Sequence, residues 1–142
     1  MKSSADSPGR LTIVGSSQGY NSRFTERNAI SLFKEFDKEW SGILAGSERY
    51  NTSKTLVQMF VYKLSQIIPA SEVTINNFCP GFSSRTSLAR EVPKGMPSIL
   101  MRVMQAVLGR TVEQGAWTYI DAAAIKGTET HGSFIFGWEM FP

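Results

Sequence analysis

The chain is poor in the side chains that most often bind metals or form covalent links. Its 142 residues include one cysteine, Cys79, and one histidine, His131. A single cysteine excludes an internal disulfide and a cysteine-based zinc cluster. A single histidine argues against a histidine-rich metal site and against a conventional Ser-His triad. We therefore expect no metal site, and we interpret Cys79 as a buried strand residue and His131 as a turn residue.

Long apolar runs and strong charge are also missing. No apolar stretch approaches the ~20 residues that cross a bilayer, and residues 1–9 lack the apolar core of a signal peptide. The formal charge of +3 is slight, and no cluster of lysine and arginine concentrates it, so nucleic acid is not indicated. These absences predict a cytoplasmic protein with a disordered segment at residues 1–9 and no membrane span.

The residues that are present describe one globular unit. Hydrophobic residues make up 42% of the sequence and charged residues 19%, as in ordinary folded domains. The length suits one domain with a core, which we assign to residues 10–142.

Apolar patterning along the chain predicts an α/β fold. Short buried strands are expected at residues 10–17, 73–79 and 133–137. Helical spacing predicts helices over residues 29–40, 49–68 and 99–108, and a last one that begins at the cap Thr111 and runs to residue 124. Loops or turns are expected at residues 18–28, 42–47, 83–97 and 127–132. This alternation is typical of a parallel, Rossmann-like sheet with helical crossovers, here with about three strands.

Tyr50 and Lys54 are the most informative pair of residues. They are four positions apart at the start of the predicted helix over residues 49–68, so their side chains would share one face. A cation beside a phenol favours the phenolate, which suits a tyrosine for giving a proton to a carbonyl or taking one from an alcohol. The alternative is an ordinary amphipathic helix with an exposed lysine and a half-buried tyrosine.

Four motifs in order resemble the C-terminal half of a short-chain dehydrogenase/reductase. They are Ser16-Ser17 after the first strand, R-Y-N-T-S-K at residues 49–54, N-N-F-C-P-G at residues 76–81 and E-T-H-G at residues 129–132. The similarity covers residues 10–137, and the closest branch is the retinol-dehydrogenase-like one with its fungal members. This resemblance implies a partial Rossmann-like fold whose N-terminal dinucleotide-binding half is missing.

The resemblance also assigns roles. Tyr50 corresponds to the catalytic proton donor, and Lys54 to the residue that favours the phenolate and binds the nicotinamide ribose. Ser17 corresponds to the serine that hydrogen-bonds the substrate oxygen, whereas Ser16 is interpreted as turn packing. The implied reaction is NAD(P)-dependent carbonyl reduction or alcohol oxidation, with NADP the better guess.

Further cofactor contacts are implied near the end of the second strand. Pro80 and Gly81 correspond to the turn beneath the nicotinamide, and Phe82 and Ser84 would lie near its carboxamide. The long segment at residues 18–48 would cover the substrate. Together with the abundant aromatic residues, that segment points to a lipophilic alcohol, ketone or secondary metabolite.

Several family features have no counterpart. The glycine-rich pyrophosphate turn is missing, since the nearest match, G-S-S-Q-G at residues 15–19, lacks the closing glycine. The usual catalytic asparagine and the residue that selects NAD or NADP are also missing. The strand at residues 10–17 would normally be central, so here one edge of it would be uncovered. An alternative interpretation is therefore a truncated, non-catalytic remnant that pairs with a full-length relative through the helix over residues 49–68.

Overall fold

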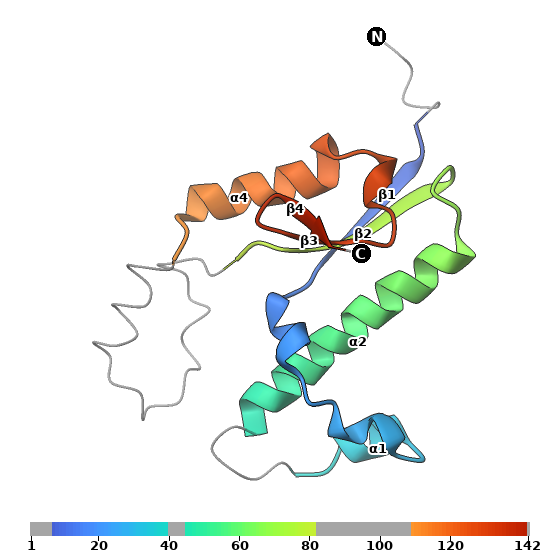
Figure 1. The fold of residues 1–142 in the computed structure, drawn as a ribbon, viewed down its shortest axis with the longest axis vertical. Coiled ribbons are helices and arrows are strands. Elements are labelled where there is room, and N and C mark those ends of the chain that lie inside the picture. The colour runs from blue at the N-terminus through green and yellow to red at the C-terminus, as the bar shows by residue number, and fades with distance from the viewer. Residues whose placement is uncertain (1–6, 40–44, 82–108, 142) are drawn as a thin grey trace.

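The computed structural model describes residues 7–39, 45–81 and 109–141, and these form a four-stranded sheet with helices on both faces (Figure 1). The strands are β1 (Gly9–Val14), β2 (Val73–Cys79), β3 (Phe134–Phe136) and β4 (Glu139–Phe141), in that spatial order. The pairs β1–β2 and β2–β3 are parallel, and β3–β4 is antiparallel. The predicted α/β class with a mostly parallel sheet is confirmed.

Strand β2 lies between two parallel neighbours and is the most buried element. Six of its seven residues are buried. Because successive side chains point to opposite faces, Asn76 and Phe78 face helix α4 (Val112–Ile120) and the turn that follows it. Asn76 Nδ2 donates to the carbonyl oxygen of Ala122, and the Phe78 ring contacts Tyr119 edge-on at 4.6 Å between ring centroids. Asn77 and Cys79 belong to the opposite face, which is covered by helix α2 (Ala45–Ile67).

Helix α2 confirms the prediction over residues 49–68, although it begins earlier, at Ala45. The break expected at residues 42–47 is therefore wrong for Ala45 to Ser47. At the other end, the amide of Ile68 still donates to Leu64, and Pro69 then ends the run, because proline cannot continue the hydrogen-bond ladder.

The helix predicted over residues 29–40 is much shorter in the structure. Only α1 (Leu32–Phe36) forms, and the Ser31 side chain does not cap it. Ile30 and Phe33 are largely exposed and Leu32 and Phe36 only partly buried, so the described residues cover the expected apolar stripe incompletely. Because tertiary packing supplies most helix stability, helical spacing alone was insufficient here. The loop expected at residues 18–28 contains two 3₁₀ helices, Ser17–Asn21 and Thr25–Asn28.

Helix α4 begins where its sequence predicted. Thr111 is the cap, and it forms a reciprocal capping box with Gln114. The helix continues through a π-helical turn, Asp121–Ile125. The loop predicted at residues 83–97 and the helix predicted at residues 99–108 lie outside the described residues.

The antiparallel strand β4 was not predicted. It follows β3 through Gly137 and Trp138, which both have positive φ angles, 59° and 84°. A two-residue hairpin turn of this kind usually carries Asn-Gly or a similar pair. Trp138 gives no such signal, because a bulky residue rarely adopts this conformation.

Strand β1 lies at one edge of the described sheet. It pairs with β2 only, and no described residue pairs with its other edge. Leu11 and Val14 remain 39% and 44% exposed, so apolar surface is left on this strand. The uncovered edge expected from the sequence is therefore present in the described part of the chain.

The turn before β3 provides a test of the packing. Gly132 has φ +79°, and an added Cβ would lie 2.6 Å from Ser65 Oγ on α2. We expect Gly132→Ala to lower the free energy of unfolding by about 1–3 kcal/mol, because it adds both backbone strain and a clash.

Urea denaturation measures this change, and Gly46→Ala is the matched control. Gly46 lies in the first turn of α2 with open space around it, so alanine there should be neutral or stabilising by up to about 1 kcal/mol. Equal effects at the two glycines would contradict the described packing of this turn.

Candidate functional site

Tyr50 and Lys54 lie together on the first half of helix α2. The Lys54 ammonium is over the Tyr50 ring, 5.6 Å from its centroid. The same ammonium is 3.5 Å from the carbonyl oxygen of Val14, the last residue of β1. The two side chains therefore share the face that the sequence predicted, and this face is directed towards the carboxyl end of β1. Tyr50 remains 47% exposed and accessible to a small molecule.

The two serines that follow β1 differ in their contacts. Ser16 is buried, and its Oγ accepts a hydrogen bond from the amide of Gln18, which caps the 3₁₀ helix Ser17–Asn21. This role agrees with the interpretation of Ser16 as a turn residue. Ser17 is half-buried, and its Oγ lies 4.0 Å from Cys79 Sγ at the end of β2. Of the pair, Ser17 is the serine whose hydroxyl lies beside the end of the neighbouring strand.

Hydrogen bonds hold the segment after β1 against α2. Thr55 Oγ1 donates to the carbonyl oxygen of Gly19 at 2.7 Å, and Gln58 Nε2 donates to that of Ser16 at 3.2 Å. Further along, the hydroxyls of Ser22 and the fully buried Thr52 are 2.8 Å apart. These contacts fix the Ser17 backbone relative to the helix that carries Tyr50 and Lys54.

The Pro80-Gly81 bend follows β2 at the same edge of the sheet. Gly81 has φ +80°, a conformation that other residues rarely adopt, so glycine is required for the bend. The side chain that approaches Gly81 is that of Arg110, whose Cδ would lie 3.2 Å from an added Cβ. Phe82 and Ser84, the other two predicted cofactor contacts, lie outside the described residues.

The structure thus brings five of the seven predicted site residues to one end of the sheet. Tyr50 contacts Lys54, Lys54 contacts the end of β1, and Ser17 contacts the end of β2, where Pro80 and Gly81 follow. The carboxyl edge of parallel strands is where open α/β sheets bind ligands. A hydroxyl, a phenol and an ammonium at this edge can donate hydrogen bonds and a proton to a substrate oxygen.

Sequence reasoning missed two residues near this edge. Gln58 lies four positions after Lys54, so the helical spacing that linked Tyr50 to Lys54 could have included it. Arg110 lies beside Gly81, and its guanidinium is 5.9 Å from the centroid of the Phe136 ring. No pattern in the sequence indicates this position, because tertiary folding brings Arg110 to the bend. In the described part of the chain, no group of three or more His, Cys, Asp or Glu residues could hold a metal ion.

The segment at residues 127–132 ties the helix and sheet together. His131 Nδ1 accepts from the amide of Ile75, so its Nε2 carries the hydrogen and donates to the carbonyl oxygen of Ser65. Thr130 Oγ1 accepts from Asn76 Nδ2. His131 is thus a turn residue, as interpreted, and it also bridges β2 and the second half of α2.

Glu129, in the same turn, has a pKa below its ordinary value. Backbone hydrogen bonds are the main cause, from its own amide and from that of Gly127, 2.8 Å from Oε1. The charges of Lys126 and Arg10 add to the effect, and slight desolvation opposes it. These amides stabilise the carboxylate form of Glu129.

We therefore expect the Glu129 carboxyl to titrate at lower pH in the folded chain than in the urea-unfolded chain, as followed by NMR of its side-chain carbon. Because folding lowers this pKa, the contribution of Glu129 to stability is complete above the unfolded pKa. It is lost as the pH falls through the folded pKa. Identical midpoints in the two states would show that the amides do not hold the carboxylate.

No family model matches the chain. Individual relatives do match. A short-chain dehydrogenase/reductase of Annulohypoxylon moriforme is 37% identical over 99% of this chain and 40% of its own length. A short-chain dehydrogenase of Penicillium oxalicum is 36% identical over 95% of this chain and 43% of its own length. One from Aspergillus niger is 31% identical over 91% of this chain and 39% of its own length.

The chain therefore spans about 40% of the length of the curated relatives that it matches. Among the described residues, no helix is both long and apolar enough to cross a membrane. The resemblance found in the four motifs agrees with fungal relatives that match nearly the whole chain. By sequence, nearly the whole chain is similar to part of the length of fungal short-chain dehydrogenases/reductases.

Proposed function

We propose that this chain forms the proton-transfer half of an oxidoreductase that interconverts a carbonyl and an alcohol. The observation that carries the proposal is the Lys54 ammonium over the Tyr50 ring at the carboxyl end of β1. It is supported by relatives that are named dehydrogenases or reductases. The complete reaction belongs to a protein of the family's full length, acting in the cytoplasm.

In the reducing direction, Ser17 donates a hydrogen bond to the substrate carbonyl oxygen and polarises the carbonyl. Tyr50 gives its phenolic proton to the same oxygen, while Lys54 stabilises the phenolate that is left. A bound NADP, or NAD, would supply the hydride for the carbonyl carbon. Proton and hydride together convert the carbonyl to an alcohol, and the reverse sequence oxidises the alcohol.

The residues fit a nicotinamide cofactor at this edge of the sheet. Lys54 would hold the ribose hydroxyls, together with Tyr50. The Pro80-Gly81 bend would lie beneath the ring, and the glycine there has no side chain to obstruct it. Arg110 already lies against one side of Gly81, so the ring would approach from the other side or displace that side chain. Phe82 and Ser84 would contact the carboxamide.

The substrate that we propose is a small lipophilic alcohol or ketone, such as a lipid, a retinoid-like compound or a secondary metabolite. The support for this class is the aromatic content of 11% and the exposed Tyr50. The segment at residues 17–28, which begins with Ser17, is hydrogen-bonded to α2. It would form one wall of the substrate site.

The proposal is tested in the full-length protein by Tyr50→Phe. We expect kcat to fall about 10²- to 10⁴-fold, because the general acid is lost while the ring is kept. NADPH binding, followed by tryptophan fluorescence, should change little in this variant. Lys54→Met should weaken both binding and turnover.

Tyr62→Phe is the matched control, because Tyr62 is also a partly exposed tyrosine of α2 but is not among the proposed site residues. It should leave kcat unchanged. Unchanged turnover in Tyr50→Phe would remove Tyr50 from the mechanism. A full-length protein that binds no NADPH would favour the non-catalytic remnant instead.

We also propose that the chain associates, with itself or with a full-length relative, through the outer face of α2. Phe60 is more than half exposed there, and Ile67 is three-quarters exposed. Such an apolar surface favours burial against a partner.

Sedimentation velocity should show dimers or larger species of the 142-residue chain. We expect Phe60→Glu to weaken the association about tenfold or more, because a charge replaces a buried ring. Gln66→Glu adds the same charge at another exposed position of α2 and is the control. A compact monomer that melts cooperatively would contradict association.

A further inference from the structure

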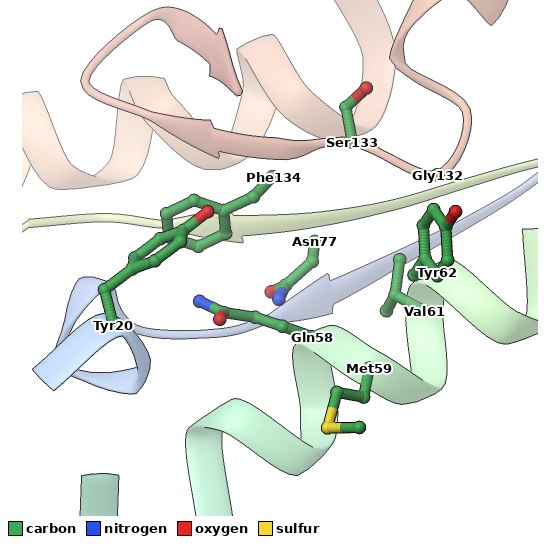
Figure 2. A pocket seen from close by; sticks show the side chains of 9 residues that line it. All are labelled: Tyr20, Gln58, Met59, Val61, Tyr62, Asn77, Gly132, Ser133 and Phe134. Carbon is green, nitrogen blue, oxygen red and sulfur yellow. The ribbon is translucent and has the colours of Figure 1, made fainter. Parts of the chain in front are cut away.

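A pocket lies between helix α2 and the sheet, beyond the candidate site (Figure 2). Its volume is about 260 Å³. An apolar cavity of about 150 Å³ can hold benzene, so this pocket has room for a ring with a substituent. It is lined by Tyr20, Gln58, Met59, Val61, Tyr62, Asn77, Gly132, Ser133 and Phe134.

Asn77 at the base of this pocket has a carboxamide without partners. Its side chain is 1% exposed, and neither Oδ1 nor Nδ2 makes a hydrogen bond. Figure 2 shows this carboxamide pointing from β2 towards α2 and Gln58. Buried polar groups are nearly always hydrogen-bonded, because an unpaired one costs free energy. Asn77 therefore provides a donor and an acceptor, side by side, for a ligand.

The neighbouring strand residue contrasts with Asn77. Asn76 is equally buried, but its Nδ2 donates to both Ala122 and Thr130 on the α4 face of the sheet, and only its Oδ1 lacks a partner among the described residues. On the α2 face, Asn77 lies against Gly15, where an added Cβ would be 2.1 Å from Oδ1. The absence of a side chain at Gly15 makes room for the Asn77 carboxamide, yet the Gly15 amide bonds to Phe78 instead.

The remaining walls favour a neutral, partly aromatic ligand. The Tyr20 and Phe134 rings contact each other edge-on at one side of the pocket, with 5.5 Å between their centroids. Met59 and Val61 add apolar surface from α2. None of the described residues that line the pocket is charged, so an ionised ligand would lose its hydration without an opposite charge from them to replace it.

We propose that this pocket binds a small neutral molecule with a carboxamide or lactam group on an apolar ring. The ligand N–H donates to Asn77 Oδ1, and the ligand C=O accepts from Asn77 Nδ2. This cyclic pair forms with either orientation of the Asn77 amide. Because both polar atoms of Asn77 are closed off from solvent, the ligand reaches them when the Gln58 side chain rotates aside.

The pocket is separate from the proposed redox site. None of Ser17, Tyr50, Lys54, Pro80 or Gly81 lines it. The two sites meet at Gln58, which holds the Ser16 carbonyl, and at Tyr20, in the segment that follows Ser17. The inference does not rest on the proposed oxidoreductase activity, because its evidence is the unpaired Asn77 carboxamide.

The test uses the 142-residue chain with two probes, benzamide and acetophenone. They share the ring and the carbonyl, but acetophenone has a methyl group in place of the amide N–H₂. Ligand-observed saturation-transfer NMR measures both dissociation constants and works for associated as well as monomeric protein. We expect benzamide to bind about tenfold more tightly, because acetophenone leaves Asn77 Oδ1 unpaired. Intermolecular NOEs should connect benzamide to Tyr20 and Phe134.

Variants assign the preference to Asn77. Asn77→Leu should reduce the ratio of the two dissociation constants to about one, while the volume-conserving control Met140→Leu, on β4 and not among the lining residues, should keep it. If Asn77→Leu does not fold, the comparison of benzamide and acetophenone binding to the unmodified chain still tests the proposal. The proposal would be overturned by equal binding of the two probes, by no benzamide binding or by NOEs to other residues. Water alone would then hydrogen-bond the Asn77 amide.

Discussion

The geometry of the candidate site depends on the hydrogen bonds between α2 and the short segment after β1. Thr55 and Gln58 donate to backbone carbonyls on either side of Ser17, at Gly19 and Ser16. Both donors come from the helix that carries Tyr50 and Lys54. Without these contacts, a serine on a connecting segment and a tyrosine on a helix would have no fixed relation. With them, the groups are held as the proposed proton transfer requires.

Strand β2 provides the second constraint, because it is buried on both faces and still carries polar side chains. On the α4 face, the Nδ2 of Asn76 is bonded to Thr130 and Ala122, and Phe78 contributes to a small core with Ala122 and Ile135, although the Asn76 Oδ1 is without a partner among the described residues. On the α2 face, both polar atoms of Asn77 stay unpaired above Gly15. The two asparagines thus differ in degree: Asn76 is held by its amide nitrogen, and Asn77 by neither polar atom.

The described residues leave much apolar surface exposed. The edge of β1, with Leu11 and Val14, and the outer face of α2, with Phe60 and Ile67, are not covered by any described element. The relatives that the chain matches are more than twice its length. A sheet edge and a helix face of this kind are stabilised by further strands, helices or a partner. The oxidoreductase and the associating chain are therefore compatible proposals that concern different surfaces.

Sequence reasoning succeeded where a local signal was strong and failed where packing decided. The apolar stripe of α2, the strand Val73–Cys79 and the Thr111 cap were all identified from residue patterns. The helix around Phe33 was overestimated, because its spacing was helical but Ile30 and Phe33 stay largely exposed among the described residues. Strand β4 was missed, because Trp138 adopts a left-handed conformation that no sequence rule assigns to tryptophan.

By itself, the sequence determined the order of β1, α2, β2, α4 and β3, the glycine at the Pro80-Gly81 bend and the common face of Tyr50 and Lys54. These features follow from local periodicity and backbone sterics, which depend on residues close together in the chain. Only the tertiary structure decided that Ser17 lies beside Cys79, that Arg110 lies against Gly81 and that Asn77 is left unpaired. Those outcomes depend on contacts between residues up to 62 positions apart, and such contacts leave no periodic trace in a single sequence.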